Sequence, residues 1–388
     1  MDSPYRLELS VAIGAVQAAA QIARTVQAAH LSSSSSSSQQ QTGSSSSSND
    51  THIKEDLSPV TVADFAIQAM LTAKLREAFA SDGVVGEESA AALREIGSDG
   101  AALLAAVVNV ISRCTDSDAP VLDGEAVCEL IDYGVADADP EITGADAGRV
   151  WVFDPIDGTR AFLRGEQYAI NVALLEGGRQ ILTVVGCPLL SADAAAPATV
   201  ADGDVDPSGR GCLLFAVRGY GAYARPLLLG PGQGEEERET RRLARHADGV
   251  SVDGLRSVTC WKHLDSGVDE AHEAVAQRLG LSFPGCDLLG WVPRWAVLAL
   301  GLANVTVWVY KKRSRHGKIW DHAGAMLLFE EVGGLITDVD GRDIDLTKGR
   351  KLTANFGFVA APRSVHHIVL KAVRDTLRAQ GKQKLLQQ

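Results

Sequence analysis

The order of apolar and polar positions along the chain predicts a protein that mixes helices and strands. Near the N-terminus, apolar residues recur at helical spacing from Leu9 to Ala20, with polar residues on the opposite side. This pattern predicts an amphipathic helix that belongs to the folded body. A second helix is predicted over 63–80. Compact apolar runs predict strands at 84–85, 150–153, 169–175, 181–185 and 213–217.

The second half of the chain continues this mixture. Helices are predicted at about 293–303 and 321–332, with a strand over 304–310 between them. Stretches rich in Gly, Ala, Asp and Pro predict surface loops at 191–210 and 229–240. Because both kinds of element occur throughout, the pattern favours a layered α/β (α+β) architecture.

The chain is expected to form one globular unit, 1–388, built from two halves. The N-terminal half covers 1–190 and the C-terminal half 211–375. Residues 32–50 are mostly Ser and Gln, a composition that cannot bury enough apolar surface to offset its ordering entropy. We therefore predict a disordered insertion there.

Composition narrows the class of protein. The net charge of −12 argues against DNA or RNA as a partner. No run of eighteen apolar residues occurs and the N-terminus lacks a basic leader, so neither a membrane span nor a signal peptide is expected. The cysteines are scattered, which indicates buried thiols in a reducing compartment, the cytoplasm. They are Cys114, Cys128, Cys187, Cys212, Cys260 and Cys286. No pattern in the sequence indicates an oligomeric state.

Acidic residues cluster at three places where the backbone changes direction. The first cluster is Gly86-Glu87-Glu88-Ser89, after an apolar strand. The second is Asp154-Pro155-Ile156-Asp157-Gly158-Thr159, directly after another strand. The third is Trp320-Asp321-His322, at a helix start. Each cluster therefore has a carboxylate at a bend, from which its side chain can point into a site shared with the other clusters.

The second cluster fits a magnesium site. Asp154 and Asp157 can converge on one point, and the Ile156 carbonyl between them offers another oxygen. Mg²⁺ prefers oxygen ligands, usually one or two carboxylates with waters and substrate phosphate. A helix that begins after Gly158 would present free backbone N–H groups to a phosphate.

Each acid alone has a simpler interpretation. Asp-Pro and Asp-Gly are common turn dipeptides, and Asp321 at a helix start is typical of a cap. Glu87 alone is typical of a solvated loop acid, and Asp64 of an acid that complements a helix dipole. The functional hypothesis depends on all of them occurring together.

Four segments carry a resemblance to a known family. The chain resembles the lithium-sensitive, Mg²⁺-dependent phosphatase superfamily that includes the inositol monophosphatases, and within it the 3′(2′),5′-bisphosphate nucleotidase branch. The segments, in the order typical of the family, are SPVTVADFAIQ (58–68), VVGEES (84–89), WVFDPIDGTRAFLRGEQYAINVALLEGG (151–178) and KIWDHAGAMLLFEEVGG (318–334). The extension after DPIDGT points to the nucleotidase branch.

The resemblance implies an αβαβα sandwich with the active site between the two halves and most metal ligands in the first. It implies two or three Mg²⁺ ions. Their ligands would be Glu87, Asp154, Asp157, Asp321 and the Ile156 carbonyl. Catalysis would use Glu87 together with a hydrogen-bonded pair of Asp64 and Thr159. The substrate phosphate would contact Asp321 and the amides of Gly158 and Thr159.

The nucleotide-binding region departs from the family pattern. Arg294 lies where the family has a ligand-binding Lys, and Trp291 replaces a Ser. Trp308 lies where an Arg is usual. Trp291 and Trp308 have two alternative roles, stacking on the base of a nucleotide or packing in the core. A tryptophan in such a position is more often part of the core. His263 lies near a ligand-facing His of the family, and Lys262 and 311–313 are further candidates for a second phosphate.

The resemblance implies removal of the 3′-phosphate from adenosine 3′,5′-bisphosphate, and from its 5′-phosphosulfate form, to give AMP and phosphate. One alternative is an inositol phosphate or another small phosphate ester as substrate. A second alternative is a non-catalytic ligand-binding relative. A covalent aspartyl-phosphate at Asp154 fits less well, because both acids of this turn are claimed as metal ligands.

Overall fold

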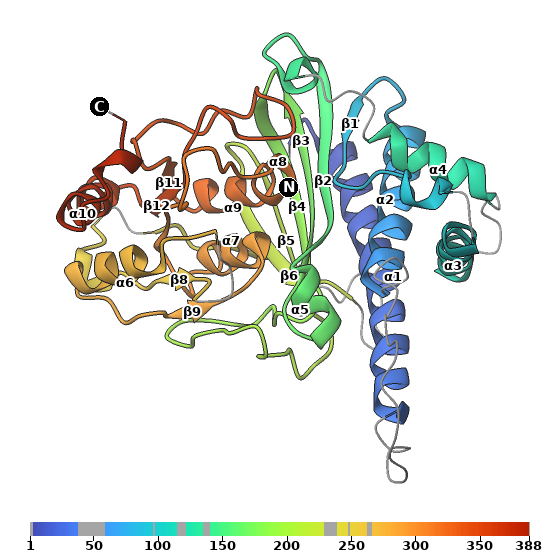
Figure 1. Ribbon diagram of the computed structural model, residues 1–388, viewed down its shortest axis with the longest axis horizontal. Coiled ribbons are helices and arrows are strands. Elements are labelled where there is room, and N and C mark those ends of the chain that lie inside the picture. The colour runs from blue at the N-terminus through green and yellow to red at the C-terminus, as the bar shows by residue number, and fades with distance from the viewer. Residues whose placement is uncertain are drawn as a thin grey trace, which may run out of the picture.

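The computed structural model describes residues 3–37, 59–95, 98–114, 122–134, 140–228, 239–246, 249–261 and 266–387. Its elements form five layers in the order helix, sheet, helix, sheet, helix (Figure 1). This arrangement confirms the expected αβαβα layered sandwich.

The layers are built from helices and strands with the following bounds. The helices are α1 (Arg6–Ser37), α2 (Pro59–Ala78), α3 (Ser98–Cys114), α4 (Gly124–Tyr133), α5 (Thr159–Arg164), α6 (Asp269–Arg278), α7 (Trp291–Ala299), α8 (Ile319–His322), α9 (Ala325–Glu331) and α10 (His366–Ala379). The strands are β1 (Gly83–Val85), β2 (Arg149–Asp157), β3 (Ala169–Glu176), β4 (Arg179–Cys187), β5 (Cys212–Val217), β6 (Gly221–Pro226), β7 (Arg241–Arg242), β8 (Val258–Thr259), β9 (Cys286–Asp287), β10 (Thr306–Trp308), β11 (Gly334–Thr337) and β12 (Phe358–Pro362).

The large sheet contains seven strands in chain order, β1 to β7. β1 pairs parallel with β2, and the remaining neighbours are antiparallel. Helices cover both faces, so the central strands are mostly apolar and show no regular alternation with polar residues. In β2, Trp151 and Phe153 pack into one core cluster, while Val150 and Val152 pack into the other.

One face of this sheet is covered by α1 and α2, which pack against each other and across β2, β3 and β4. By length and composition α1 could cross a membrane. Its apolar face is instead buried in the core of this fold, with Val16 and Ile22 almost fully covered. α1 continues to Ser37, so residues 32–37 are helical, contrary to the predicted start of the disordered insertion. The remainder of that insertion lies outside the described residues.

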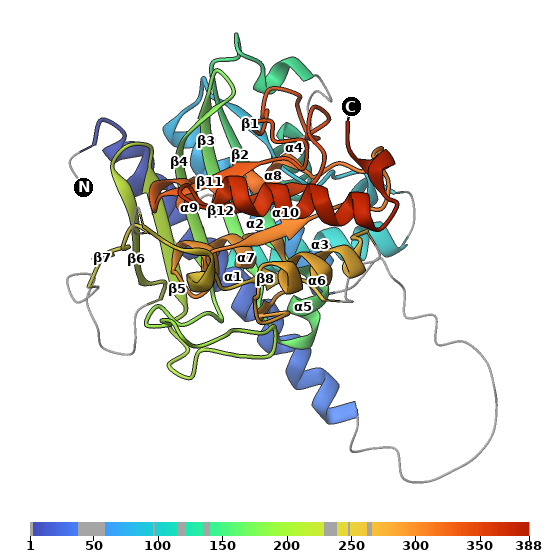
Figure 2. The same cartoon turned by 90° about the vertical axis from the view of Figure 1, so that its left-hand side faces the viewer.

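The opposite face is covered by α7 and α9, which pack against β3 and β4. Behind them lies the antiparallel sheet β10-β12-β11, and α10 with α6 forms the last layer (Figure 2). The middle helices are therefore buried between two sheets. This burial explains why every residue of α7 is buried and why all of them except Arg294 are apolar.

Two predicted elements differ from the structure at places that later prove chemically important. The strand expected to end at Phe153 runs on as β2 to Asp157. The single helix expected over 321–332 is divided into α8 and α9 around Gly324. A Cβ at Gly324 would lie only 2.2 Å from Asn171 Oδ1. The division therefore lets the chain approach β3 more closely than a side chain would allow.

Candidate metal centre and adjoining pocket

An irregularity in β2 brings two aspartates together. In a regular strand, residues three apart point to opposite faces. The pairing of β2 with β3 shifts register between Asp154 and Asp157, as in a β-bulge, which redirects the side chains. Ile156 N donates to Asp154 Oδ1 at 3.0 Å and fixes that carboxylate within the turn. Both acids can then face one point.

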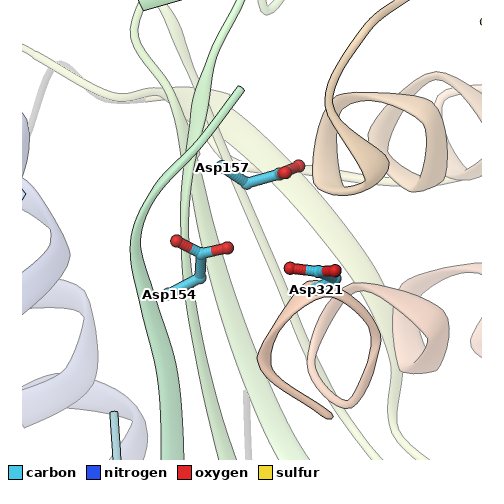
Figure 3. A group of neighbouring side chains, drawn as sticks. All are labelled: Asp154, Asp157 and Asp321. Atoms are coloured by element: carbon cyan, nitrogen blue, oxygen red, sulfur yellow. The ribbon is translucent and has the colours of Figure 1, made fainter. Parts of the chain in front are cut away.

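Asp321, on α8, completes a group of three carboxylates (Figure 3). Each of Asp154, Asp157 and Asp321 offers an oxygen atom, and these atoms lie within 4.8 Å of one another. Asp154 is central to the group. Its carboxyl interacts with those of Asp321 and of Glu87, which follows β1, and each pair alters the pKa of its members. The structure thus unites the four proposed carboxylate ligands from three separate segments.

Asp64 reaches the same region from α2. Its side chain is 7% exposed. Its negative charge acts on Asp154, and it is itself affected by Glu88 and Glu87. The expected pair with Thr159 is different in the structure. Within the described residues Thr159 Oγ1 donates only to the Ile156 carbonyl, at 3.5 Å, because Thr159 opens α5 directly above that turn.

Crowding of buried carboxylates raises their pKa values. Burial is the main cause for Asp154, and repulsion from Glu87, Asp157 and Asp321 adds to it, so its pKa lies well above the usual range. Burial and the same kind of repulsion raise the pKa of Asp321 well above its usual range. Burial also raises the pKa of Asp157 to about 7, although the Val292 amide and the charge of Arg294 act in the opposite direction.

The donor set fits a hard divalent cation. Asp154 is 1% exposed, so its charge is poorly hydrated, and its nearest partners are further carboxyl groups. Buried like charges of this kind are stable when paired with cations or bound to metal. All the available ligands are oxygen atoms, which Mg²⁺ prefers. The residues present therefore suit a magnesium centre.

The start of α7 positions Asp157 from the other side. Val292 N donates a short hydrogen bond to Asp157 Oδ2. A Cβ at Gly290 would lie 2.8 Å from the same oxygen, so this position needs a residue without a side chain. The helix start therefore holds one carboxylate oxygen and leaves the other for a ligand.

A pocket opens beside the acidic group. Its volume is about 290 Å³, near the lower end of small-molecule sites, which run from roughly 300 to 1,000 Å³. It therefore admits more than a bare phosphate. The lining residues are Asp157, Gly158, Thr159, Arg160, Ser266, Leu289, Gly290, Trp291, Tyr310, Arg315, His316, Gly317, Lys318 and Asp321.

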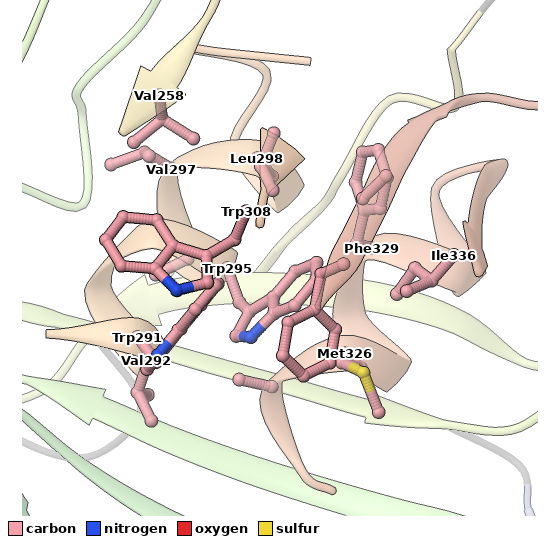
Figure 4. Packing of buried hydrophobic residues seen from close by; sticks show 14 of the residues in the cluster. Val258, Trp291, Val292, Trp295, Val297, Leu298, Trp308, Met326, Phe329 and Ile336 are labelled. Carbon is pink, nitrogen blue, oxygen red and sulfur yellow. The ribbon is translucent and has the colours of Figure 1, made fainter. Parts of the chain in front are cut away.

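Arg294 was expected to contact substrate and lies in the core instead, and Trp308 takes the core role that was the commoner of its two alternatives. Arg294 is 0% exposed and does not line the pocket. Its guanidinium donates to the carbonyls of Gly290 and Leu289 and lies 3.7 Å from the centre of the Trp291 ring. Trp308 is also 0% exposed and packs among the tryptophans of α7 (Figure 4). Arg294 is buried because its side chain folds back along its own helix to tie down the helix start.

The remaining substrate candidates divide in the same way. Gly158, Thr159 and Asp321 line the pocket, as expected. Trp291 also lines it, with a side chain that is mostly in the core. His263 and Lys262 lie outside the described residues, so their proposed contacts stay predictions.

Several residues near the centre were not singled out from the sequence. Burial and the charge of Glu87 raise the pKa of Glu88 to about 7. Arg350 Nη2 donates to the Glu87 carbonyl at 3.0 Å and so holds that loop. Lys318 acts electrostatically on Glu87 and Asp321. Arg160 and Arg315 line the pocket. The sequence features that could have pointed to these residues were the second acid beside Glu87, the Arg after DPIDGT and the basic residues before the WDHAG segment.

Comparison with solved structures identifies the fold. An inositol monophosphatase of Staphylococcus aureus matches with a TM-score of 0.53 at 16% identity, covering 98% of this chain and 98% of that one. The inositol monophosphatase of Anabaena (Nostoc) sp. matches with a TM-score of 0.53 at 15% identity, covering 97% of this chain and 100% of that one. The layered architecture described above is therefore the inositol monophosphatase fold.

Comparison with sequences identifies the family. The model of the inositol monophosphatase family matches residues 8–378, so the chain belongs to this family and is a phosphatase. Three relatives are each named 3′(2′),5′-bisphosphate nucleotidase. The protein of Emericella nidulans is 36% identical over 84% of this chain and 90% of its own length. The protein of Schizosaccharomyces pombe is 33% identical over 82% of this chain and 84% of its own length. The protein of Oryza sativa is 30% identical over 98% of this chain and 97% of its own length.

Proposed function

We propose that this phosphatase removes the 3′-phosphate from adenosine 3′,5′-bisphosphate, giving AMP and phosphate, and acts in the same way on the 5′-phosphosulfate form. The observation that carries the proposal is the pocket that joins the acidic centre to Gly158 and Thr159. The relatives named above, which match most of the chain, support the choice of a bisphosphate nucleotide.

Two or three Mg²⁺ ions are the proposed cofactor. Their ligands would be the carboxylates of Glu87, Asp154, Asp157 and Asp321 with the Ile156 carbonyl. Bound Mg²⁺ supplies positive charge for the phosphoryl oxygens and makes water more acidic. The weak 3.5 Å bond from Thr159 leaves the Ile156 carbonyl available as a ligand.

The chain's own groups would then orient the ester and handle the proton. The amides of Gly158 and Thr159, at the start of α5, are proposed to hold the reacting phosphate, with Asp321 on the other side of the pocket. Glu87 is proposed as the proton acceptor, since burial raises its pKa and so makes it a better base. Asp64 is proposed to complete the pair with Thr159 once substrate tightens the site, because catalytic hydrogen bonds are often loose before binding.

A phosphate-release screen with Mg²⁺ tests the substrate. Adenosine 3′,5′-bisphosphate, its 5′-phosphosulfate form, and a set of inositol phosphates are compared at equal concentrations. We expect the two nucleotides to have the highest kcat/KM. Faster release from an inositol phosphate would favour the first alternative, and no release from any ester in the presence of Mg²⁺ would favour a non-catalytic relative.

Lithium provides a second test, because the resemblance to lithium-sensitive phosphatases implies inhibition. We expect Li⁺ to reduce turnover of the bisphosphate nucleotide in a titration at fixed Mg²⁺. Matched additions of NaCl control for ionic strength. Equal rates in LiCl and NaCl would contradict close kinship with the lithium-sensitive members.

The proposed setting is the cytoplasm, with a small phosphate ester as the partner. All six cysteines are free, and five of them are buried, as expected for thiols in a reducing compartment.

A further inference from the structure

The lining of the pocket carries charges of both signs. Asp157 and Asp321 contribute the acidic part. Arg160, the second residue of α5, and Arg315, between β10 and α8, contribute guanidinium groups from two separate segments. A cavity with carboxylates for metal and separate cations has the charge distribution needed for a ligand with two anionic groups.

In the part of the chain that the structure describes, neither arginine pairs with an acid. Elsewhere, arginines commonly pair with acids, as Arg149 does with Glu8 and Arg313 with Asp340. Among the described residues, the side chains of Arg160 and Arg315 make neither an ion pair nor a hydrogen bond, and both residues are exposed. In a chain with a net charge of −12, unpaired cations beside a pocket leave room for an anion supplied by the ligand.

Other cations near the centre are already engaged or cannot reach the pocket. Lys318 lines the pocket but acts on Glu87 and Asp321. Arg294 is fully buried in the core and does not line the pocket. Lys312 is exposed on the segment that carries Arg315, yet it is not part of the lining. Arg160 and Arg315 are therefore the unpaired arginines among the described lining residues, and they suit an incoming anion.

We propose that Arg160 and Arg315 bind a second phosphate group of the substrate, while the phosphate to be hydrolysed lies at Gly158 and Thr159. The inference rests on the proposed function and names the residues that select for two phosphates. The ligand class is a nucleotide or sugar with phosphate groups on two different oxygen atoms. Arginine suits this role because its planar fork can donate two hydrogen bonds to one phosphate.

The test compares substrates that differ by one phosphate. Adenosine 3′,5′-bisphosphate and adenosine 3′-phosphate are hydrolysed by the wild type, Arg160→Met and Arg315→Met in the presence of Mg²⁺. We expect each variant to lower kcat/KM for the bisphosphate about tenfold, the loss of one charge-assisted contact. The value for the monophosphate should change less than about twofold on the same grounds. Arg179→Met is the matched control, because Arg179 is exposed at the start of β4 and does not line the pocket, and it should change neither value.

A binding measurement separates contact from turnover. The product AMP keeps the 5′-phosphate, so calorimetry should show weaker AMP binding to both arginine variants and an unchanged affinity for adenosine. Arg315→Lys should recover part of the AMP affinity, because it restores the charge without the fork. Equal losses for bisphosphate and monophosphate, or unchanged AMP affinity, would overturn the assignment.

Failure of the proposed function has a different signature. If the wild type hydrolyses inositol phosphates and no nucleotide, the nucleotide proposal is wrong. The ratio of kcat/KM for inositol 1,4-bisphosphate to kcat/KM for inositol 1-phosphate then decides the role of the arginines. A ratio that falls in both variants supports a second-phosphate site, and a ratio that stays constant rejects it.

Discussion

At the scale of single residues, Asp157 links the two sides of the centre. One of its oxygens accepts a hydrogen bond from α7, while its carboxylate belongs to the group with Asp154 and Asp321. Its neighbours in sequence, Gly158 and Thr159, line the pocket. Removing one oxygen from Asp157 should therefore affect the metal centre more than the fold.

Asp157→Asn is expected to lower kcat by about three orders of magnitude, because the acidic centre loses a charge that metal ligation needs. Circular dichroism should show an unchanged secondary structure. Asp123→Asn is the control, since Asp123 caps α4 and Asn caps equally well. Normal turnover by Asp157→Asn would reject this residue as a ligand.

The raised pKa of Asp157 also predicts a pH effect on stability without metal. The folded pKa of about 7 lies above the unfolded value near 3.8, so the native state holds a proton that the unfolded chain has lost. Stability from this group is therefore fully present below about pH 4 and is lost as pH rises to 7. The loss is on the order of 4 kcal/mol at about 1.4 kcal/mol per pKa unit.

The measurement is urea unfolding in EDTA from pH 4.5 to 7.5. The free energy of unfolding of the wild type, relative to Asp157→Asn, should fall as pH rises. Comparing the two proteins cancels the buried histidines, whose lowered pKa values make stability change in the opposite direction below pH 6.5. A constant difference across this range would show that the pKa of Asp157 is not raised.

At the scale of elements, the division between α8 and α9 sets the position of Asp321. The joint packs against β3, where Asn171 Nδ2 donates to the Trp320 carbonyl at 2.6 Å. Nearby, Gln180 Nε2 donates to the Ala323 carbonyl at 2.6 Å. Two amide side chains of the large sheet thus hold the carbonyls that flank Asp321. The geometry of the proposed metal centre therefore depends on this close contact.

Gly324→Ala tests the contact. The added Cβ would lie 2.2 Å from Asn171 Oδ1 and 2.9 Å from Thr183 Oγ1. Overpacking of this kind costs about 1–3 kcal/mol, and the displaced joint should weaken Mg²⁺ binding. Gly14→Ala in α1 is the control, because nothing lies within 4 Å of its Cβ, and it should slightly stabilise the helix. Equal Mg²⁺ affinity of both variants would contradict the role of the joint.

The sequence predicted most elements of the fold and placed the acidic clusters at their ends. Apolar runs such as those of β3 and β4 identify strands, because helices cover both faces of the sheet. The extension of β2 to Asp157 was missed, because Asp-Pro and Asp-Gly are local turn signals and the pairing with β3 overrides them. The burial of Arg294 was also missed, since a charged residue in an apolar helix pattern does not reveal that it folds back onto its own backbone.

At the scale of the whole molecule, the centre joins segments of both halves of the chain. Glu87 follows β1, Asp154 lies in β2 and Asp321 in α8. Without metal, these buried carboxyls repel one another, and the repulsion weakens the folded state. A cation that binds only the native arrangement should therefore stabilise the entire protein.

Mg²⁺ is expected to raise the melting temperature of the wild type. At a free Mg²⁺ concentration one hundred times the dissociation constant, binding raises the free energy of unfolding by about 2.7 kcal/mol. EDTA should reverse the shift, and NaCl of equal ionic strength should not reproduce it. In Asp157→Asn the shift should be much smaller. A shift of equal size in both proteins would mean that Mg²⁺ stabilises the chain at some other place.

The position of Asp321 in the last fifth of the chain has a consequence for biosynthesis. A ribosome-bound chain that has emerged as far as Asp157 already contains Glu87, Asp154 and Asp157. It does not yet contain α8, which carries Asp321, the fourth proposed ligand. Binding of an ion at the proposed centre would then follow the synthesis of α8. A chain shortened before residue 321 would not acquire phosphatase activity at any Mg²⁺ concentration.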